Sequence, residues 1–90
     1  MTVIVLERAS VSLRGELTRW LLEVRAGVFV GRVSRRVRER LWTKVRERNP
    51  DGGCLLIWTA PNEQGFRVET YGDTTRTLED FDGLMLVRRS

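Results

Sequence analysis

Short runs of β-branched residues, typical of strands, alternate with two segments whose apolar residues recur at helical spacing. This alternation limits the folds that the chain can adopt. The first run, TVIVLE over residues 2–7, is typical of a buried strand. Ser10 or Ser12 can cap the helix that follows. We predict that this helix ends at Gly27, because its apolar residues share one face at 3.6 residues per turn. These residues are Leu13, Leu17, Trp20, Leu21 and Val24.

A second strand and a second helix follow. VFVGRV, residues 28–33, predicts the strand, and Ser34 can cap the helix. Apolar side chains recur at every fourth position of this helix, at Val37, Leu41 and Val45. Basic side chains with the same spacing share another side of it, at Arg36, Arg40 and Lys44.

The remainder of the chain predicts strands alone. NPDGG, residues 49–53, is a stop and turn signal, and residues 54–72 predict a hairpin around the turn PNEQG. LMLVRR, residues 84–89, predicts a last short strand. We therefore expect one α+β domain over residues 1–90, ferredoxin-like, with one antiparallel sheet and both helices on one face. That fold serves many functions and decides none of them.

The length of the chain predicts self-association. Ninety residues lie near the lower limit for a single core, and the chain carries three tryptophans. A sheet with two helices on one face leaves its other face bare. We therefore predict a homodimer in which the strand at residues 84–89 pairs with the sheet of the other subunit.

The composition excludes several classes of site. The chain has no histidine, which excludes Ser-His and Cys-His catalysis and His-ligated zinc. Its one cysteine, Cys54 in CLLIW, predicts a buried thiol and no internal disulfide. The start MTVIVLER is too short and too soon charged for a signal peptide, and no apolar run is long enough to cross a bilayer. We expect a soluble cytoplasmic protein with no membrane partner.

Charge is distributed unevenly along the chain. Residues 8–48 hold twelve basic and four acidic side chains, whereas residues 49–82 hold two and seven. Fifteen of the sixteen cations are arginine, whose planar fork suits phosphate and carboxylate. This distribution favours a polyanion such as nucleic acid, and a solvated helix face with internal ion pairs is the alternative.

Several motifs together resemble one protein family. WLLEVRAGVFVG, a helix containing RERLW, GFRVETYG and FDGLMLV follow one another between Val3 and about Val87. In this order and spacing they resemble the type I-E branch of the CRISPR-associated protein two family. The resemblance implies a ferredoxin-like homodimer at the centre of the spacer-acquisition complex. Two dimers of the integrase, CRISPR-associated protein one, clamp that homodimer, and the double-stranded protospacer DNA lies across the assembly. The implied role is a non-catalytic, DNA-binding structural subunit that needs no cofactor.

The resemblance also implies DNA-binding residues. It places Arg14 at the start of the first helix, and Arg76 in DTTRTLED, against DNA phosphates. The sequence departs from the family pattern at Ser12 and Thr75, where the family carries basic residues. We expect the arginines of the second helix to compensate for this lost charge. These are Arg36, Arg38 and Arg40.

The same resemblance offers an enzymatic interpretation. Some family members are described as metal-dependent nucleases, and their acidic residue at the end of the first strand corresponds to Glu7. Glu7 from two subunits would then bind Mg²⁺ and cleave RNA or DNA. The family more often has aspartate here, and one carboxylate per subunit provides few ligands for a metal ion. A ribonuclease toxin of related fold is a third interpretation. The sequence leaves open whether the chain is an enzyme.

Two other groups of side chains favour structural roles. The tryptophans are candidates for base stacking, but their positions favour the core or a dimer interface. They are Trp20, Trp42 and Trp58. Asp80 and Asp82 are better explained by a solvated connector, or a docking surface for a basic partner, than by a metal pair.

Overall fold

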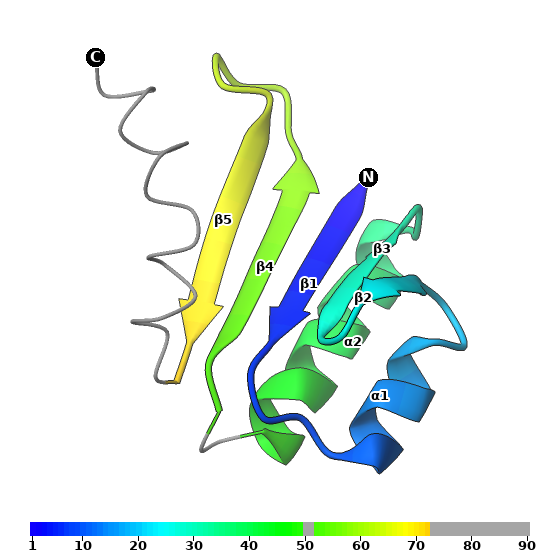
Figure 1. Ribbon diagram of the computed structural model, residues 1–90. Helices are drawn as coiled ribbons and strands as arrows, with labels where there is room; N and C mark the ends of the chain where they lie inside the picture. Colours follow the sequence, from blue (N-terminus) through cyan, green and yellow to red (C-terminus); the bar gives the residue numbers. More distant parts are fainter. Residues whose placement is uncertain (50–51, 73–90) are drawn as a thin grey trace.

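A computed structural model describes residues 1–49 and 52–72. Its elements, in chain order, are β1 (Thr2–Leu6), α1 (Val11–Leu17), β2 (Leu22–Arg25), β3 (Val28–Gly31), α2 (Arg35–Arg48), β4 (Cys54–Thr59) and β5 (Phe66–Tyr71). The five strands form one antiparallel sheet in the order β2-β3-β1-β4-β5. Both helices lie on the same face of this sheet (Figure 1). This architecture confirms the predicted α+β, ferredoxin-like fold. The strand β5 lies at the edge of the sheet, beside β4.

The core lies between the helices and the central strand β1. Ile4 pairs in register with Phe29 of β3 and Leu56 of β4, and all three side chains are buried. Alternate residues of a strand point to opposite faces, which places these side chains toward α1 and α2. Cys54 is fully buried on the same side, as predicted, and this burial raises the pKa of its thiol.

Serine caps begin both helices. The Ser10 hydroxyl accepts a hydrogen bond of 3.1 Å from the backbone N–H of Leu13, and Ser34 accepts one of 3.2 Å from Val37. Such caps satisfy amide donors that have no partner inside the helix. Ser34 therefore caps α2 as predicted, and Ser10 rather than Ser12 caps α1.

The prediction of a first helix extending to Gly27 was wrong. The helix α1 ends at Leu17, and the chain reverses within the next four residues to enter β2 at Leu22. Trp20 and Val24, expected on the helical core face, are 49% and 52% exposed. Pairing with β3 gives residues 22–25 backbone partners that a short isolated helix cannot match.

Gly27 makes the turn between β2 and β3 instead of ending a helix. Its φ of +80° is costly for residues with a side chain, and its carbonyl accepts a hydrogen bond of 2.8 Å from Leu6 N–H. A Cβ atom here would lie 2.5 Å from the carbonyl oxygen of Leu6. The glycine thus lets the β2–β3 turn lie against the end of β1.

The predicted hairpin at residues 54–72 is confirmed. The strands β4 and β5 pair over six residues each, from Cys54↔Tyr71 to Thr59↔Phe66. Ala60 N–H donates a hydrogen bond of 3.0 Å to the carbonyl of Gly65, which closes the turn. The strand expected at residues 84–89 lies outside the described residues.

Candidate nucleic-acid interface

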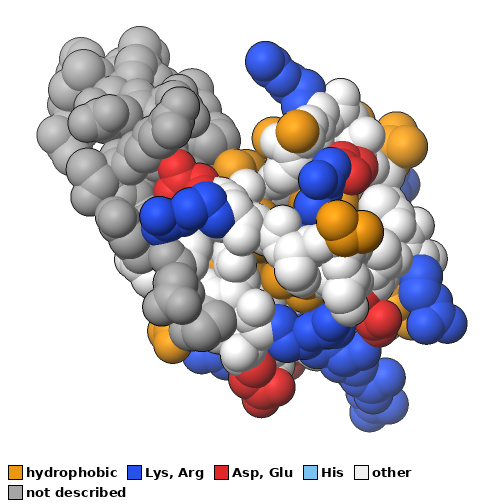
Figure 2. Space-filling view, turned by 60° about the horizontal axis from the view of Figure 1, so that its bottom comes forward, with side chains coloured by type: hydrophobic (Ala, Val, Ile, Leu, Met, Phe, Trp, Pro, Cys, Tyr) orange, Lys and Arg blue, Asp and Glu red, His pale blue; other side chains and the backbone are white. Residues whose placement is uncertain are grey.

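Basic side chains dominate the exposed surface of α2. Arg36 and Arg40 are exposed and lie one turn apart, so they share one side of the helix as predicted. Within residues 1–49 and 52–72 neither of them forms an ion pair. Figure 2 shows basic side chains gathered along the lower margin of the view, where the helices lie. These two arginines are therefore available to an external anion.

Arg38 does not share that side of the helix. Two residues along an α-helix correspond to about 200° of rotation, which turns Arg38 away from Arg36 and Arg40. Its guanidinium carbon lies 4.6 Å from the centroid of the Trp58 ring on β4. The structure therefore separates Arg38 from the other two predicted residues of α2.

Arg14 on α1 is held in place by Glu23 on β2. Its Nε donates a hydrogen bond of 3.1 Å to Glu23 Oε2, and its terminal nitrogen lies 2.9 Å from the same oxygen. Glu23 Oε2 also accepts a hydrogen bond of 2.9 Å from Gly27 N–H. This backbone hydrogen bond, followed by Arg14, lowers the pKa of Glu23. Arg14 nevertheless keeps 40% of its side chain exposed, so it can contact another anion from a fixed position.

A second arginine at the start of α1 is not apparent from the sequence. The terminal Nη2 of Arg48, in the last turn of α2, donates a hydrogen bond of 2.6 Å to the Ser12 hydroxyl. Ser12 and Arg14 are separated by about 200° around α1, so Arg48 and Arg14 flank its first turn from different sides. No local pattern signals this contact, because it joins residues 36 positions apart.

An ion pair between the helices neutralises one nearby carboxylate. Lys44 Nζ donates a hydrogen bond of 2.7 Å to Glu16 Oε1. This bond and the charge of Lys44 lower the pKa of Glu16, and the charges of Arg19 and Arg48 contribute. Glu16 therefore stays ionised and paired at neutral pH, and Arg48 keeps donors for another acceptor.

Glu7 follows the end of β1 and is fixed through its backbone. Its N–H donates a hydrogen bond of 2.9 Å to Gly53, and its carbonyl accepts one of 3.2 Å from the Asn49 side chain. In the part of the chain that the structure describes, no three His, Cys, Asp or Glu residues are grouped closely enough to hold a metal ion. The described residues of one chain therefore offer Mg²⁺ no group of three such ligands around Glu7, and the predicted metal site takes a second Glu7 from the other subunit.

The remaining predicted residues are divided between the core, the surface and undescribed positions. Trp42 is buried at 5% exposure, and Trp58 packs against the core, whereas Trp20 is half exposed and lies outside the core. Arg76 and the two aspartates at positions 80 and 82 lie outside the described residues. No helix within the described ranges is long and apolar enough to cross a membrane.

The chain matches a known protein family. The model of the family described as CRISPR-associated protein (Cas_Cas2CT1978) matches residues 1–86. The match covers every described strand and helix, including those that carry Arg14, Arg36, Arg40 and Arg48.

Proposed function

Since the chain belongs to the CRISPR-associated protein (Cas_Cas2CT1978) family, we propose that it is a non-catalytic, DNA-binding structural subunit of the spacer-acquisition complex. In this role a homodimer bridges dimers of the integrase, CRISPR-associated protein one, and holds the double-stranded protospacer in the cytoplasm. The family itself establishes a CRISPR-related role. The assignment to the type I-E branch, and to scaffolding instead of nuclease chemistry, is part of the proposal.

The contact between Arg48 and Ser12 carries this proposal. The type I-E pattern has a basic residue at the position of Ser12, and this chain brings Arg48 there from α2. Together with Arg14, which Glu23 orients, it puts two guanidinium groups beside the first turn of α1. From different sides of this turn, each guanidinium group can contact a phosphate of a nucleic-acid backbone.

Recognition in this role depends on phosphate and not on base sequence. The helix α2, RRVRERLWTKVRER, carries no Asn or Gln, the side chains that read adenine in the major groove. Its Arg36 and Arg40 extend the positive surface along the helix. Binding by the assembled complex should therefore fall steeply with salt and vary little among duplexes of one length. Strong sequence discrimination by this subunit alone would contradict the proposal.

The face of the sheet opposite the helices supports the homodimer. Val3 and Val5 of the central strand are half-buried there, and Leu22 and Val68 on the outer strands are 69% and 38% exposed. Apolar side chains also reach the surface in the upper half of Figure 2. A second copy would remove this apolar surface from water.

Integration of a labelled duplex into a repeat-bearing plasmid, by purified integrase plus each variant, tests the role. We expect the combination of Arg14→Ala with Arg48→Ala to lose integration, because it removes four phosphate contacts per dimer. The variant should still dimerise and bind the integrase. Glu7→Ala should integrate normally, because a scaffold needs no Mg²⁺ at that position.

The reverse result would replace the scaffold with a nuclease. If Glu7→Ala abolishes integration and the double arginine variant retains it, Mg²⁺ bound by Glu7 of both subunits would have to activate water for phosphodiester cleavage. Circular dichroism of both variants separates loss of fold from loss of function.

A further inference from the structure

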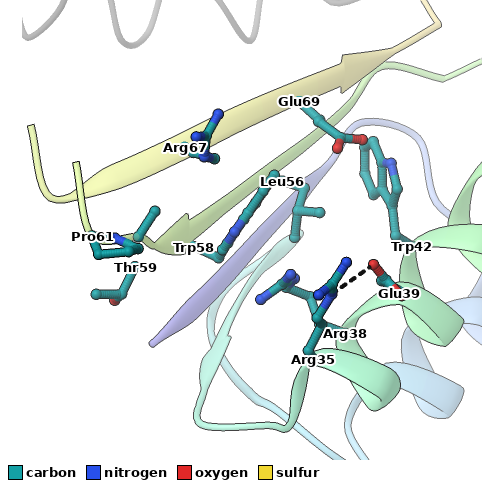
Figure 3. A pocket seen from close by; sticks show the side chains of 11 residues that line it. Arg35, Arg38, Glu39, Trp42, Leu56, Trp58, Thr59, Pro61, Arg67 and Glu69 are labelled. Atoms are coloured by element: carbon teal, nitrogen blue, oxygen red, sulfur yellow. Dashed lines mark hydrogen bonds and ion pairs between the residues drawn. The ribbon is translucent and has the colours of Figure 1, made fainter.

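A groove lies between the first half of α2 and the strands β4 and β5, on the helix side of the sheet (Figure 3). Its volume is about 420 Å³, within the range of small-ligand sites. Three arginines, two glutamates and two tryptophans line it. Among the described residues proposed above to contact duplex DNA, Arg38 lines this groove, and Arg14, Arg36, Arg40 and Arg48 do not.

Two arginines enter the groove from opposite sides. Arg38 comes from α2, whereas Arg67 comes from β5, where it is paired in register with Trp58. Among the described residues neither arginine forms an ion pair, whereas Arg35 is bound to Glu39 at 3.3 Å. Guanidinium groups on both sides of the groove suit an anion, and phosphate can accept two hydrogen bonds from each.

A flat cationic surface lies beside these donors. The Arg38 guanidinium sits over the Trp58 ring at 4.6 Å from its centroid, and Trp58 is only half-buried. Nucleobases stack on arginine planes and on indole rings once they are unpaired. Trp42 also lines the groove, but it is only 5% exposed and therefore offers little surface for stacking.

Two glutamates in the groove limit which anionic ligands can bind there. Glu39 and Glu69 line the same groove, and Glu69 lies beside Trp42 in Figure 3. They would repel a peptide rich in Asp or Glu. A nucleotide combines an anionic phosphate with a base, and the exocyclic amino groups of cytosine, adenine and guanine donate hydrogen bonds to carboxylates.

We propose that this groove binds one unpaired, amino-bearing nucleotide of a single strand. The base stacks on the Arg38–Trp58 pair, the phosphate contacts Arg67, and the amino group donates to Glu69. This inference stands on the groove alone and goes beyond the backbone contacts to duplex DNA proposed above.

Indole N–H signals in the NMR spectrum of the ¹⁵N-labelled full chain test the proposal. The three tryptophan signals are assigned with Trp20→Phe and Trp42→Phe, and the chain is titrated with the single strands dC4 and dT4. We expect dC4 to shift the Trp58 signal, and dT4 to bind about tenfold more weakly, because thymine has no amino group. Arg67→Ser, on the exposed strand β5, should weaken the binding of dC4 about tenfold. Arg25→Ser removes the same charge from β2 and serves as the control.

Three outcomes would overturn the proposal. They are a dC4 titration that leaves the Trp58 signal unmoved, equal affinity for dC4 and dT4, and equal weakening by Arg25→Ser and Arg67→Ser. A shift of Trp58 by a hexaglutamate peptide, without one by dC4, would assign the groove to an acidic protein segment instead. Duplex binding and integration are expected to be normal in Arg67→Ser, so failure here is distinguishable from failure of the scaffold role.

Discussion

Arg48 of α2 donates a hydrogen bond of 2.6 Å to the hydroxyl of Ser12 on α1. The two residues lie at opposite ends of the helical half of the chain, and the packing of α1 against α2 brings them together. The proposed assignment to the type I-E branch expects a basic residue at the position of Ser12. The last turn of α2 therefore supplies, through Arg48, a positive charge at the position of Ser12.

Removing this charge should weaken DNA binding. We expect Arg48→Ala to reduce the affinity of the complex for duplex DNA and to flatten its salt dependence by about one unit of slope for each phosphate that is no longer neutralised. The matched control is Arg46→Ala, which removes the same charge from another side of the same helical turn. Affinity measured by fluorescence anisotropy over a series of salt concentrations checks this. Equal effects of the two variants would show that only total charge matters.

Elements with local signals were predictable from the sequence. The caps of α1 and α2, the apolar spacing in α2, and the β4–β5 hairpin each depend on residues close in sequence. The β2–β3 hairpin was missed because Trp20 and Val24 satisfy helical spacing as well as strand alternation. Tertiary pairing with β3 decided between the two.

The sequence could predict the arrangement of the candidate site residues only where they lie on the same helix. The shared side of Arg36 and Arg40 follows from their spacing of four residues. By contrast, the partners of Arg14, Arg38 and Arg48 come from other elements. No pattern within one segment contains those contacts, since the packing of β2, β4 and α1 creates them.

Two glycines should respond oppositely to alanine. At Gly27 the positive φ and the approach of the Leu6 carbonyl make a side chain costly, and we expect Gly27→Ala to lose about 1–3 kcal/mol of stability. Gly15 lies within α1 with no atom near its missing Cβ, so Gly15→Ala should gain about 0.5–1 kcal/mol. Thermal unfolding by circular dichroism measures both. A neutral Gly27→Ala would contradict the turn geometry.

Acid should destabilise the fold through Glu23. Its hydrogen bonds to Gly27 and Arg14 lower its pKa in the folded state below the ordinary value of 4.5. The stabilisation is then present above about pH 4.5 and is lost as the pH falls through the lowered value. Glu23→Gln should therefore lower Tm near neutral pH and converge with the unmodified chain in acid. Tm measured from about pH 7 to about pH 3 checks this. The control is Glu63→Gln, an exposed change on the β4–β5 turn that should follow the unmodified chain throughout.

A charge placed on the open face of the sheet should dissociate the proposed homodimer. Leu22 is 69% exposed on that face, and it pairs with Val30 in the row that includes Val3. An aspartate there would have to be desolvated in an apolar interface, so we expect Leu22→Asp to be a folded monomer at micromolar concentration. Val11→Asp, at a position 83% exposed at the start of α1, is the control and should remain dimeric. Light scattering gives the mass of each. A monomeric unmodified chain would exclude the homodimer, and a dimeric Leu22→Asp would move the interface to another surface.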